Sequence, residues 1–171
     1  KVYMPSYCCE SMLQPFLDRG IFIEYYDVLI GDQGLKYLID INEETDIFFA
    51  ISYFGYGMSN MDSYIDKFKK RNILVIEDIT HRIFNKKNHC HNSDYLIASI
   101  RKWFPLLSGG LAIKAKGGFK DIWLQDPVEE HINKRLEAME LKAKYMNGMD
   151  KTDGNLKNKF LRLYSEFNQS I

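Results

Sequence analysis

The chain has 171 residues, of which 46% are hydrophobic and 27% are charged, so it carries enough apolar material for one globular core. Its 23 lysines and arginines balance 23 aspartates and glutamates, and this balance leaves no overall field that would favour nucleic acid or an anionic membrane as a partner. We therefore expect its partner to be a small molecule or another protein.

No apolar run approaches the ~20 residues that cross a bilayer, and the first residues lack the charged-then-apolar order of a signal peptide. We therefore expect a cytoplasmic protein. Because Cys8, Cys9 and Cys90 are odd in number and two of them are adjacent, reduced thiols are expected rather than a disulfide framework. The chain lacks an initiator Met, which predicts that it is a piece of a longer protein.

The first part of the chain predicts helices that alternate with β-rich segments. A short helix is expected over residues 9–18, and a β-rich run follows Gly20 at residues 21–26. Residues 35–39 predict another short helix. The uninterrupted apolar run at residues 47–52 is typical of a strand that is buried on both faces.

The same alternation continues downstream. Asn60 is a candidate N-cap for a helix over residues 61–70, where apolar residues recur at helical spacing. A buried strand is expected at residues 73–76, and two more strands at 95–98 and 111–113. This order predicts a mostly parallel sheet that is covered by helices on both sides.

The chain changes character after residue 125. Pro127 opens a helical pattern that runs to about Tyr145, and a second amphipathic helix is expected over residues 156–167. We expect this tail to lead toward another domain or subunit.

Polar side chains follow three of the predicted strands. Ligands of open α/β sheets bind beyond the carboxyl ends of the strands, so these side chains are the first candidates for a site. They are Ser52 and Tyr53, then Asp78 and His81, then Ser99 and Lys102. A carboxylate, an imidazole, hydroxyls and an amine are thus expected to meet at one edge of the sheet.

This set of groups fits the requirements of pyridoxal 5'-phosphate (PLP). The cofactor needs a lysine for its Schiff base, a carboxylate that keeps the pyridine nitrogen protonated, and hydroxyls or amides for its phosphate. The sequence therefore predicts PLP as a cofactor and no metal.

The string at residues 76–81, the segments 93–95 and 99–102, and the pair Gly109–Gly110 resemble the core of fold-type-I PLP enzymes. Within that class they are most similar to the sugar aminotransferases of the DegT/StrS family, over roughly residues 2 to 114. The resemblance implies a three-layer α/β/α fold with a mostly parallel sheet, the large domain of the aspartate aminotransferase fold in incomplete form. Residues 1–125 would be the central part of the PLP-binding large domain, and residues 126–171 a helical segment that leads toward a small C-terminal domain.

The resemblance also implies roles for four residues. Lys102 would be the catalytic lysine that forms the aldimine, and Asp78 would pair with the pyridine nitrogen. His81 would lie near the 3-hydroxyl of the ring, and Ser99 would bind the phosphate. The implied reaction moves an amino group, from glutamate, onto a nucleotide-linked keto sugar for polysaccharide biosynthesis, in a homodimer.

Other functions remain open beside this one. Another PLP enzyme of the same fold is one alternative, although Lys102 argues against a dehydratase in which the lysine is replaced. A non-catalytic fragment or binding module that keeps the fold is a second, since a family segment that cradles the phosphate would precede residue 1. The run His89-Cys90-His91 contains metal-binding residue types, but adjacent ligands without a second cluster are more typical of a solvated loop.

Overall fold

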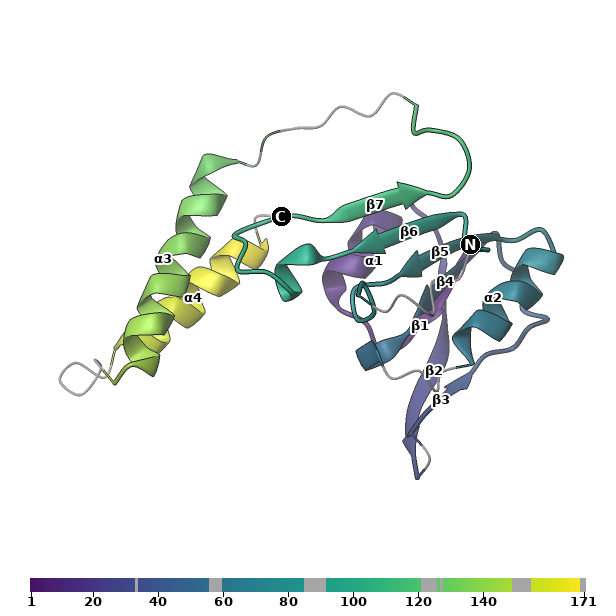
Figure 1. The fold of residues 1–171 in the computed structure, drawn as a ribbon, viewed down its shortest axis with the longest axis horizontal. Coiled ribbons are helices and arrows are strands. Elements are labelled where there is room, and N and C mark those ends of the chain that lie inside the picture. Colours follow the sequence, from purple (N-terminus) through teal and green to yellow (C-terminus); the bar gives the residue numbers. More distant parts are fainter. Residues whose placement is uncertain are drawn as a thin grey trace. The chain divides into compact units, whose positions relative to one another are not determined.

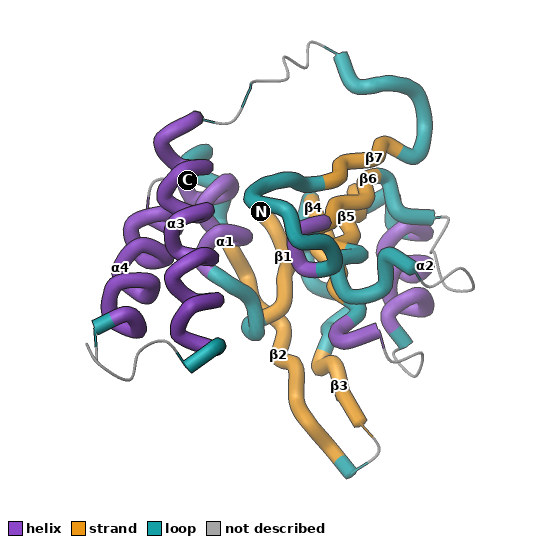
Figure 2. Tube along the Cα trace, turned by 60° about the vertical axis from the view of Figure 1, so that its left-hand side comes forward, coloured by secondary structure: helices purple, strands orange, loops and turns teal. Residues whose placement is uncertain are grey.

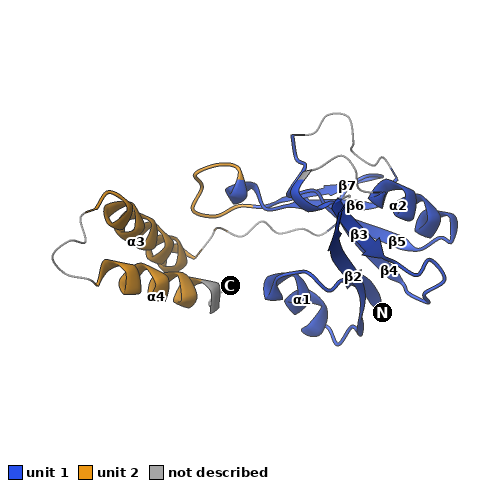
Figure 3. Cartoon of the chain, turned by 90° about the horizontal axis from the view of Figure 1, so that it is seen from below, with its two compact units in different colours: residues 1–102, 110–120 blue, residues 103–109, 121–171 orange. Residues whose placement is uncertain are grey.

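The computed structural model describes residues 1–32, 34–55, 60–84, 92–120, 126, 128–148 and 155–169. The chain forms two compact units, residues 1–102 with 110–120, and residues 103–109 with 121–171 (Figure 3). The first unit is an α/β unit, and two helices form most of the described part of the second.

Seven strands and two α-helices make up the described part of the first unit (Figure 1). The strands are β1 (Val2–Pro5), β2 (Ile23–Gly31), β3 (Gly34–Leu38), β4 (Ile47–Ile51), β5 (Leu74–Asp78), β6 (Tyr95–Ala98) and β7 (Leu111–Lys114). The helices are α1 (Glu10–Leu17) and α2 (Met61–Lys70), with short 3-10 turns at η1 (Tyr53–Gly55) and η2 (Ile100–Lys102).

The strands form one sheet in the order β3-β2-β1-β4-β5-β6-β7. The five central strands are parallel, and β3 and β7 are antiparallel edge strands, so the predicted mostly parallel sheet is confirmed. From β1 the chain proceeds to β2 on one side, and from β4 to β5 on the other. The sheet therefore has a switch point between β1 and β4, where open α/β sheets bind their ligands.

The two helices cover opposite faces of this sheet. Phe48 and Phe49 are consecutive in β4, so their side chains point to opposite faces. Phe48 stacks on Phe68 of α2 with ring centroids 4.1 Å apart, whereas Phe49 meets Phe16 of α1 edge to face at 6.1 Å. The first unit is thus a three-layer α/β/α arrangement, and Figure 2 shows α1 and α2 on either side of the strands.

Helix α2 follows from the apolar spacing of its sequence. Met61, Ile65 and Phe68 recur at intervals of three and four residues, and all three side chains are fully buried. Burial of each such side chain stabilises the fold by about 1.5–3 kcal/mol. Asn60 does precede the helix as predicted, but its side chain makes no capping hydrogen bond.

The prediction of a helix at residues 35–39 is wrong, because this segment forms strand β3. It pairs antiparallel with residues 27–31 of β2, in a hairpin that extends beyond the β1–β2 pairing (Figures 1 and 2). Tyr37 is buried against the ring of Tyr26 at 6.5 Å. Five residues are too few for a stable helix, whereas cross-strand pairing and burial of Tyr37 stabilise the strand.

The second unit contains helices α3 (Glu129–Met146) and α4 (Leu156–Gln169), which confirms the two predicted helices. They pack through buried apolar residues, and Tyr145 meets Phe160 with ring centroids 5.7 Å apart. Pro127 lies outside the described residues. No helix in the described ranges combines the length and apolarity that a membrane span needs. The predicted boundary at residue 125 stays a prediction.

Candidate functional site

A cavity of about 320 Å³ opens at the carboxyl ends of the central strands, a volume in the range of small-molecule sites. Its lining combines apolar and aromatic side chains with a few polar groups. The lining residues are Tyr7, Cys8, Cys9, Met12, Ile51, Tyr53, Phe54, Asp78, His81 and Lys102. Three of the four predicted site residues therefore meet in one cavity of the first unit.

Asp78 reaches the cavity because it is the last residue of β5. Glu77 and Asp78 are neighbours in the strand and point to opposite faces, so Glu77 is fully buried while Asp78 lines the cavity. The backbone N–H of Thr80 donates to Asp78 Oδ1 at 2.7 Å, which fixes the carboxylate at the start of the turn.

His81 lies in the turn that follows β5. Its Nδ1 accepts a hydrogen bond from the backbone N–H of Phe54 at 3.1 Å, and its ring stacks on the Phe54 ring at 5.3 Å with an interplanar angle of 19°. Burial lowers the pKa of His81, and the positive charge of Lys102 lowers it further, while Asp78 acts in the opposite direction.

Lys102 is the last residue of η2, the turn that follows β6, and its backbone N–H donates to Ser99 O at 3.4 Å. The side chain is exposed at the cavity. Within the described ranges, no carboxylate forms an ion pair with it. The amine is thus not held by a structural counter-ion there.

Ser99 is not among the residues that line the cavity. Its backbone N–H donates to Thr80 Oγ1 at 2.9 Å, and its Oγ accepts from Arg101 Nε at 3.4 Å. Ser99 therefore ties the end of β6 to the turn that carries His81. Its predicted contact with a phosphate stays a prediction.

Aromatic rings form one wall of the cavity. Tyr7 meets Tyr53 with centroids 5.5 Å apart, and Tyr53 meets Phe54 at 5.8 Å. The Tyr53 hydroxyl donates to the Tyr7 carbonyl oxygen, and burial raises the pKa of this hydroxyl. Sequence reasoning named Tyr53 but missed Tyr7 and Phe54 as lining residues. Tyr7 follows β1 by two residues, so the rule that selected the other candidates would have found it.

A buried ion pair lies on the opposite face of β5. Arg82, 5% exposed, pairs with the fully buried Glu77 and with Asp62 at 3.1 Å. Ser93 Oγ donates to the second Glu77 oxygen at 2.7 Å. Since Glu77 and Arg82 bracket Asp78 and His81 in sequence, the pair fixes both ends of the turn.

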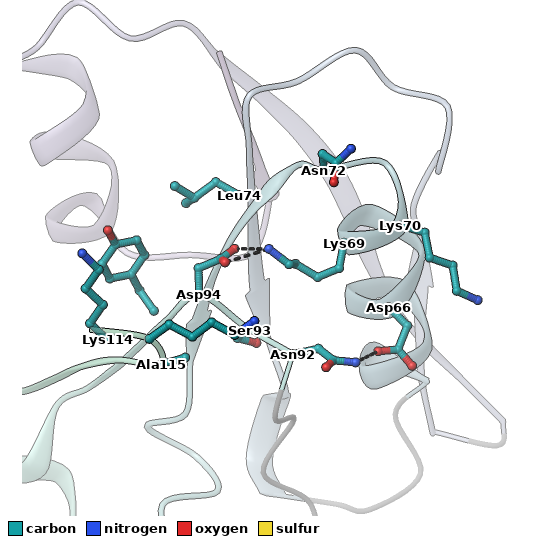
Figure 4. A pocket seen from close by; sticks show the side chains of 12 residues that line it. Asp66, Lys69, Lys70, Asn72, Leu74, Asn92, Ser93, Asp94, Lys114 and Ala115 are labelled. Atoms are coloured by element: carbon teal, nitrogen blue, oxygen red, sulfur yellow. Dashed lines mark hydrogen bonds and ion pairs between the residues drawn. The ribbon is translucent and has the colours of Figure 1, made fainter. Parts of the chain in front are cut away.

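A second, larger cavity of about 630 Å³ lies at the amino ends of β5 and β6. There Lys69 Nζ donates to both oxygens of Asp94 at 2.7 Å, as Figure 4 shows, and Asp94 also accepts from Val75 N at 2.8 Å. Lys70 points away from this pair (Figure 4). Lys69 and Asp94 satisfy each other, as is typical of a structural pair, whereas Lys70, Lys114 and Lys116 line the same cavity and form no ion pair with another described residue.

The residues His89-Cys90-His91, considered as metal ligands, lie outside the described residues. Among the residues that are described, no group of three His, Cys, Asp or Glu side chains could hold a metal ion.

The donor set of the smaller cavity fits the pyridine ring and the carbonyl carbon of PLP. It offers a lysine amine without a counter-ion among the described residues, a carboxylate, an imidazole and aromatic rings against which a planar ring could pack. Lys102, Asp78 and His81 are the residues that would hold the cofactor.

No family model matches the chain, and no curated protein matches it. Among solved structures, the chain is similar to a PLP-bound protein from Clostridium difficile 630 that carries a provisional description as an aminotransferase. The TM-score is 0.48 and the sequence identity 13%, over 98% of this chain and 47% of the other. The chain thus spans about half the length of that protein.

Proposed function

We propose that the chain binds PLP in the cavity of about 320 Å³ and belongs to a PLP-dependent aminotransferase, with Lys102 as the catalytic lysine. One observation carries the proposal. Asp78, His81 and Lys102 lie at the carboxyl ends of two neighbouring parallel strands and line the same cavity. This cavity supplies the amine and the carboxylate that the cofactor requires, together with an imidazole.

Each residue has a role that its surroundings support. The Nζ of Lys102 would form the bond to the cofactor and would afterwards hold the proton that moves during the reaction. Because no carboxylate in the described ranges pairs with this amine, it is available for both roles. Asp78, fixed by the Thr80 amide, would stabilise a proton on the pyridine nitrogen. PLP, when bound, supplies the electron sink for chemistry at the substrate carbon.

The finer assignment rests on the resemblance of residues 76–81 and 99–102. It proposes a sugar aminotransferase of the DegT/StrS type that takes its amino group from glutamate and transfers it to a nucleotide-linked keto sugar. It further proposes a homodimer, an incomplete fold-type-I large domain at residues 1–125, and a helical segment toward a small domain at residues 126–171.

A non-catalytic binding module is the second candidate, and one observation favours it. Lys102 is the only lysine or arginine that lines the cavity in the described part of the chain. Once this lysine is bonded to the cofactor, the described part of the lining offers no arginine or second lysine to the phosphate.

The test is to add PLP to the chain and to follow the visible absorbance band that its Schiff base with a lysine gives. Lys102→Ala should lose this band, whereas Lys69→Ala, which removes a lysine of the larger cavity, should retain it. Equal absorbance for both variants would overturn the role of Lys102. No binding by the unchanged chain, also with glutamate and a nucleotide-linked sugar present, would favour the binding module.

A further inference from the structure

Phe54 has a backbone conformation that is rare for a residue with a side chain. Its φ is 58° and its ψ is 10°, in the left-handed region that favours glycine. Phe54 lies in η1, directly beyond β4, and it lines the same cavity as His81. A strained backbone conformation persists only where the surrounding structure holds it in place. The contacts of Phe54 therefore indicate the role of this conformation.

Both parts of Phe54 contact His81. The backbone N–H donates to His81 Nδ1 at 3.1 Å, and the aromatic ring stacks on the imidazole at 5.3 Å and 19°. A nitrogen that accepts a hydrogen bond carries no proton, so the ring proton of the neutral imidazole is on Nε2. One residue thus fixes the tautomer of His81 and the plane of its ring.

The other neighbours of His81 are compatible with a neutral ring that carries its proton on Nε2. The Tyr53 ring lies 6.0 Å away and its hydroxyl is held by Tyr7, so it does not compete for the imidazole. The charged groups that act on His81 are Lys102 and Asp78, and the positive charge of Lys102 opposes protonation of the ring. No acceptor for Nε2 is found among the described residues, which leaves this N–H for a ligand.

We propose that Phe54 is a positioning residue that fixes His81 as the Nε2-protonated neutral tautomer, so that the imidazole donates a hydrogen bond to a ligand in the cavity. The identity of that ligand as PLP rests on the proposed function. The tautomer and its cause do not, because they follow from contacts within the chain.

The first arm of the test needs no cofactor. An N–H···N hydrogen bond transmits a coupling between the two nitrogens, so NMR of the 15N-labelled chain reports the Phe54–His81 bond directly. We expect a resolved coupling between Phe54 N and His81 Nδ1, together with a protonated Nε2. A proton on Nδ1, or the absence of the coupling with His81 neutral, would overturn the proposal.

The second arm measures PLP affinity in two matched variants. His81→Gln can place an amide N–H near the position of Nε2, whereas the shorter His81→Asn reaches only the position of Nδ1, where its amide oxygen can accept from the Phe54 N–H. We expect the Asn variant to bind PLP about 10-fold more weakly than the Gln variant, because only the longer side chain can donate a hydrogen bond from the position of Nε2. Equal loss in both variants would contradict the donor role of Nε2.

Phe54→Gly separates positioning from folding. Glycine adopts the left-handed conformation without strain and keeps the backbone N–H, so the melting temperature should hold. Because the variant loses the ring that stacks on the imidazole, His81 is held less firmly, and both the coupling and the PLP affinity should fall. Unchanged coupling and affinity would contradict the role of the Phe54 side chain. If the unchanged chain does not bind PLP, the proposed function fails, and the NMR arm still decides the claim about His81.

Discussion

Both ends of the sheet carry a lysine and an aspartate, but these two residues interact differently at the two ends. At the amino end, Lys69 contacts both oxygens of Asp94, and Asp94 also accepts from a backbone amide. At the carboxyl end, Lys102 and Asp78 line one cavity, yet no ion pair joins them in the described structure. A lysine and an aspartate that form an ion pair stabilise the fold. A lysine and an aspartate that line a cavity without forming an ion pair are available to a ligand.

This difference shows that residue type does not distinguish a site from a structural cluster. The larger cavity has more lysines, but its central lysine and aspartate already hold each other. The smaller cavity is backed by the buried Glu77–Arg82 pair, which fixes the turn between Asp78 and His81.

The largest expected effect is on the pair that supports the carboxyl end. Arg82→Met would leave the fully buried Glu77 without its counter-charge, and we expect the free energy of unfolding to fall by about 3–5 kcal/mol. Denaturant unfolding measures this loss. The double variant Glu77→Gln with Arg82→Met should recover most of it, and a double variant as unstable as the single one would contradict the ion pair as the cause.

Next in size is the effect of Asp78→Asn on PLP affinity. The amide oxygen can still accept from Thr80, but the negative charge for the pyridine nitrogen is lost, so PLP should bind roughly 10- to 100-fold more weakly. A PLP titration measures the change. Asp94→Asn at the amino end is the matched control and should leave the affinity unchanged; a similar loss there would remove the contrast between the two ends.

A smaller effect is expected for Lys69→Met at the amino end. The Lys69 and Asp94 side chains are 29% and 35% exposed, so their pair is partly screened, and its loss should lower the free energy of unfolding by about 0.5–1 kcal/mol. PLP affinity should not change. A large loss of PLP binding by a variant of unchanged stability would show that the larger cavity is the functional one.

The smallest effect concerns pH. The unfolded chain takes up a proton at His81 near pH ~6.5, but the folded chain takes it up only at lower pH, because burial and Lys102 lower the pKa. The free energy of unfolding should therefore fall as the pH drops below about 6.5, until the folded chain is protonated as well. His81→Gln should reduce this slope, and an identical slope in both chains would contradict the lowered pKa.

The centre of the sheet could be predicted from the sequence because β4 is buried on both faces along almost its whole length. The run at residues 47–51 has no polar interruption, and this continuity identifies β4 without knowledge of its partners. The β3 segment has no such signal. Its structure depends on pairing with β2 and on burial of Tyr37, and both are tertiary effects that a local pattern does not contain.

Three polar residues of the candidate site could be predicted from the sequence, whereas Tyr53 alone of its aromatic wall was named. Asp78, His81 and Lys102 were found because they follow predicted strands that end at one edge of the sheet. Phe54 was missed because a positive φ is not expected of a phenylalanine. The Glu77–Arg82 pair was missed because a buried counter-charge depends on which face of β5 each residue takes.

The most direct test of the central claim is to locate the PLP attachment site. Borohydride reduction of the chain with PLP makes the bond to a lysine permanent, and mass spectrometry of the digested chain then identifies that lysine. We expect the label on Lys102 and none on Lys69. A label spread evenly over surface lysines, or one concentrated on Lys69 or its neighbours in the larger cavity, would contradict this expectation.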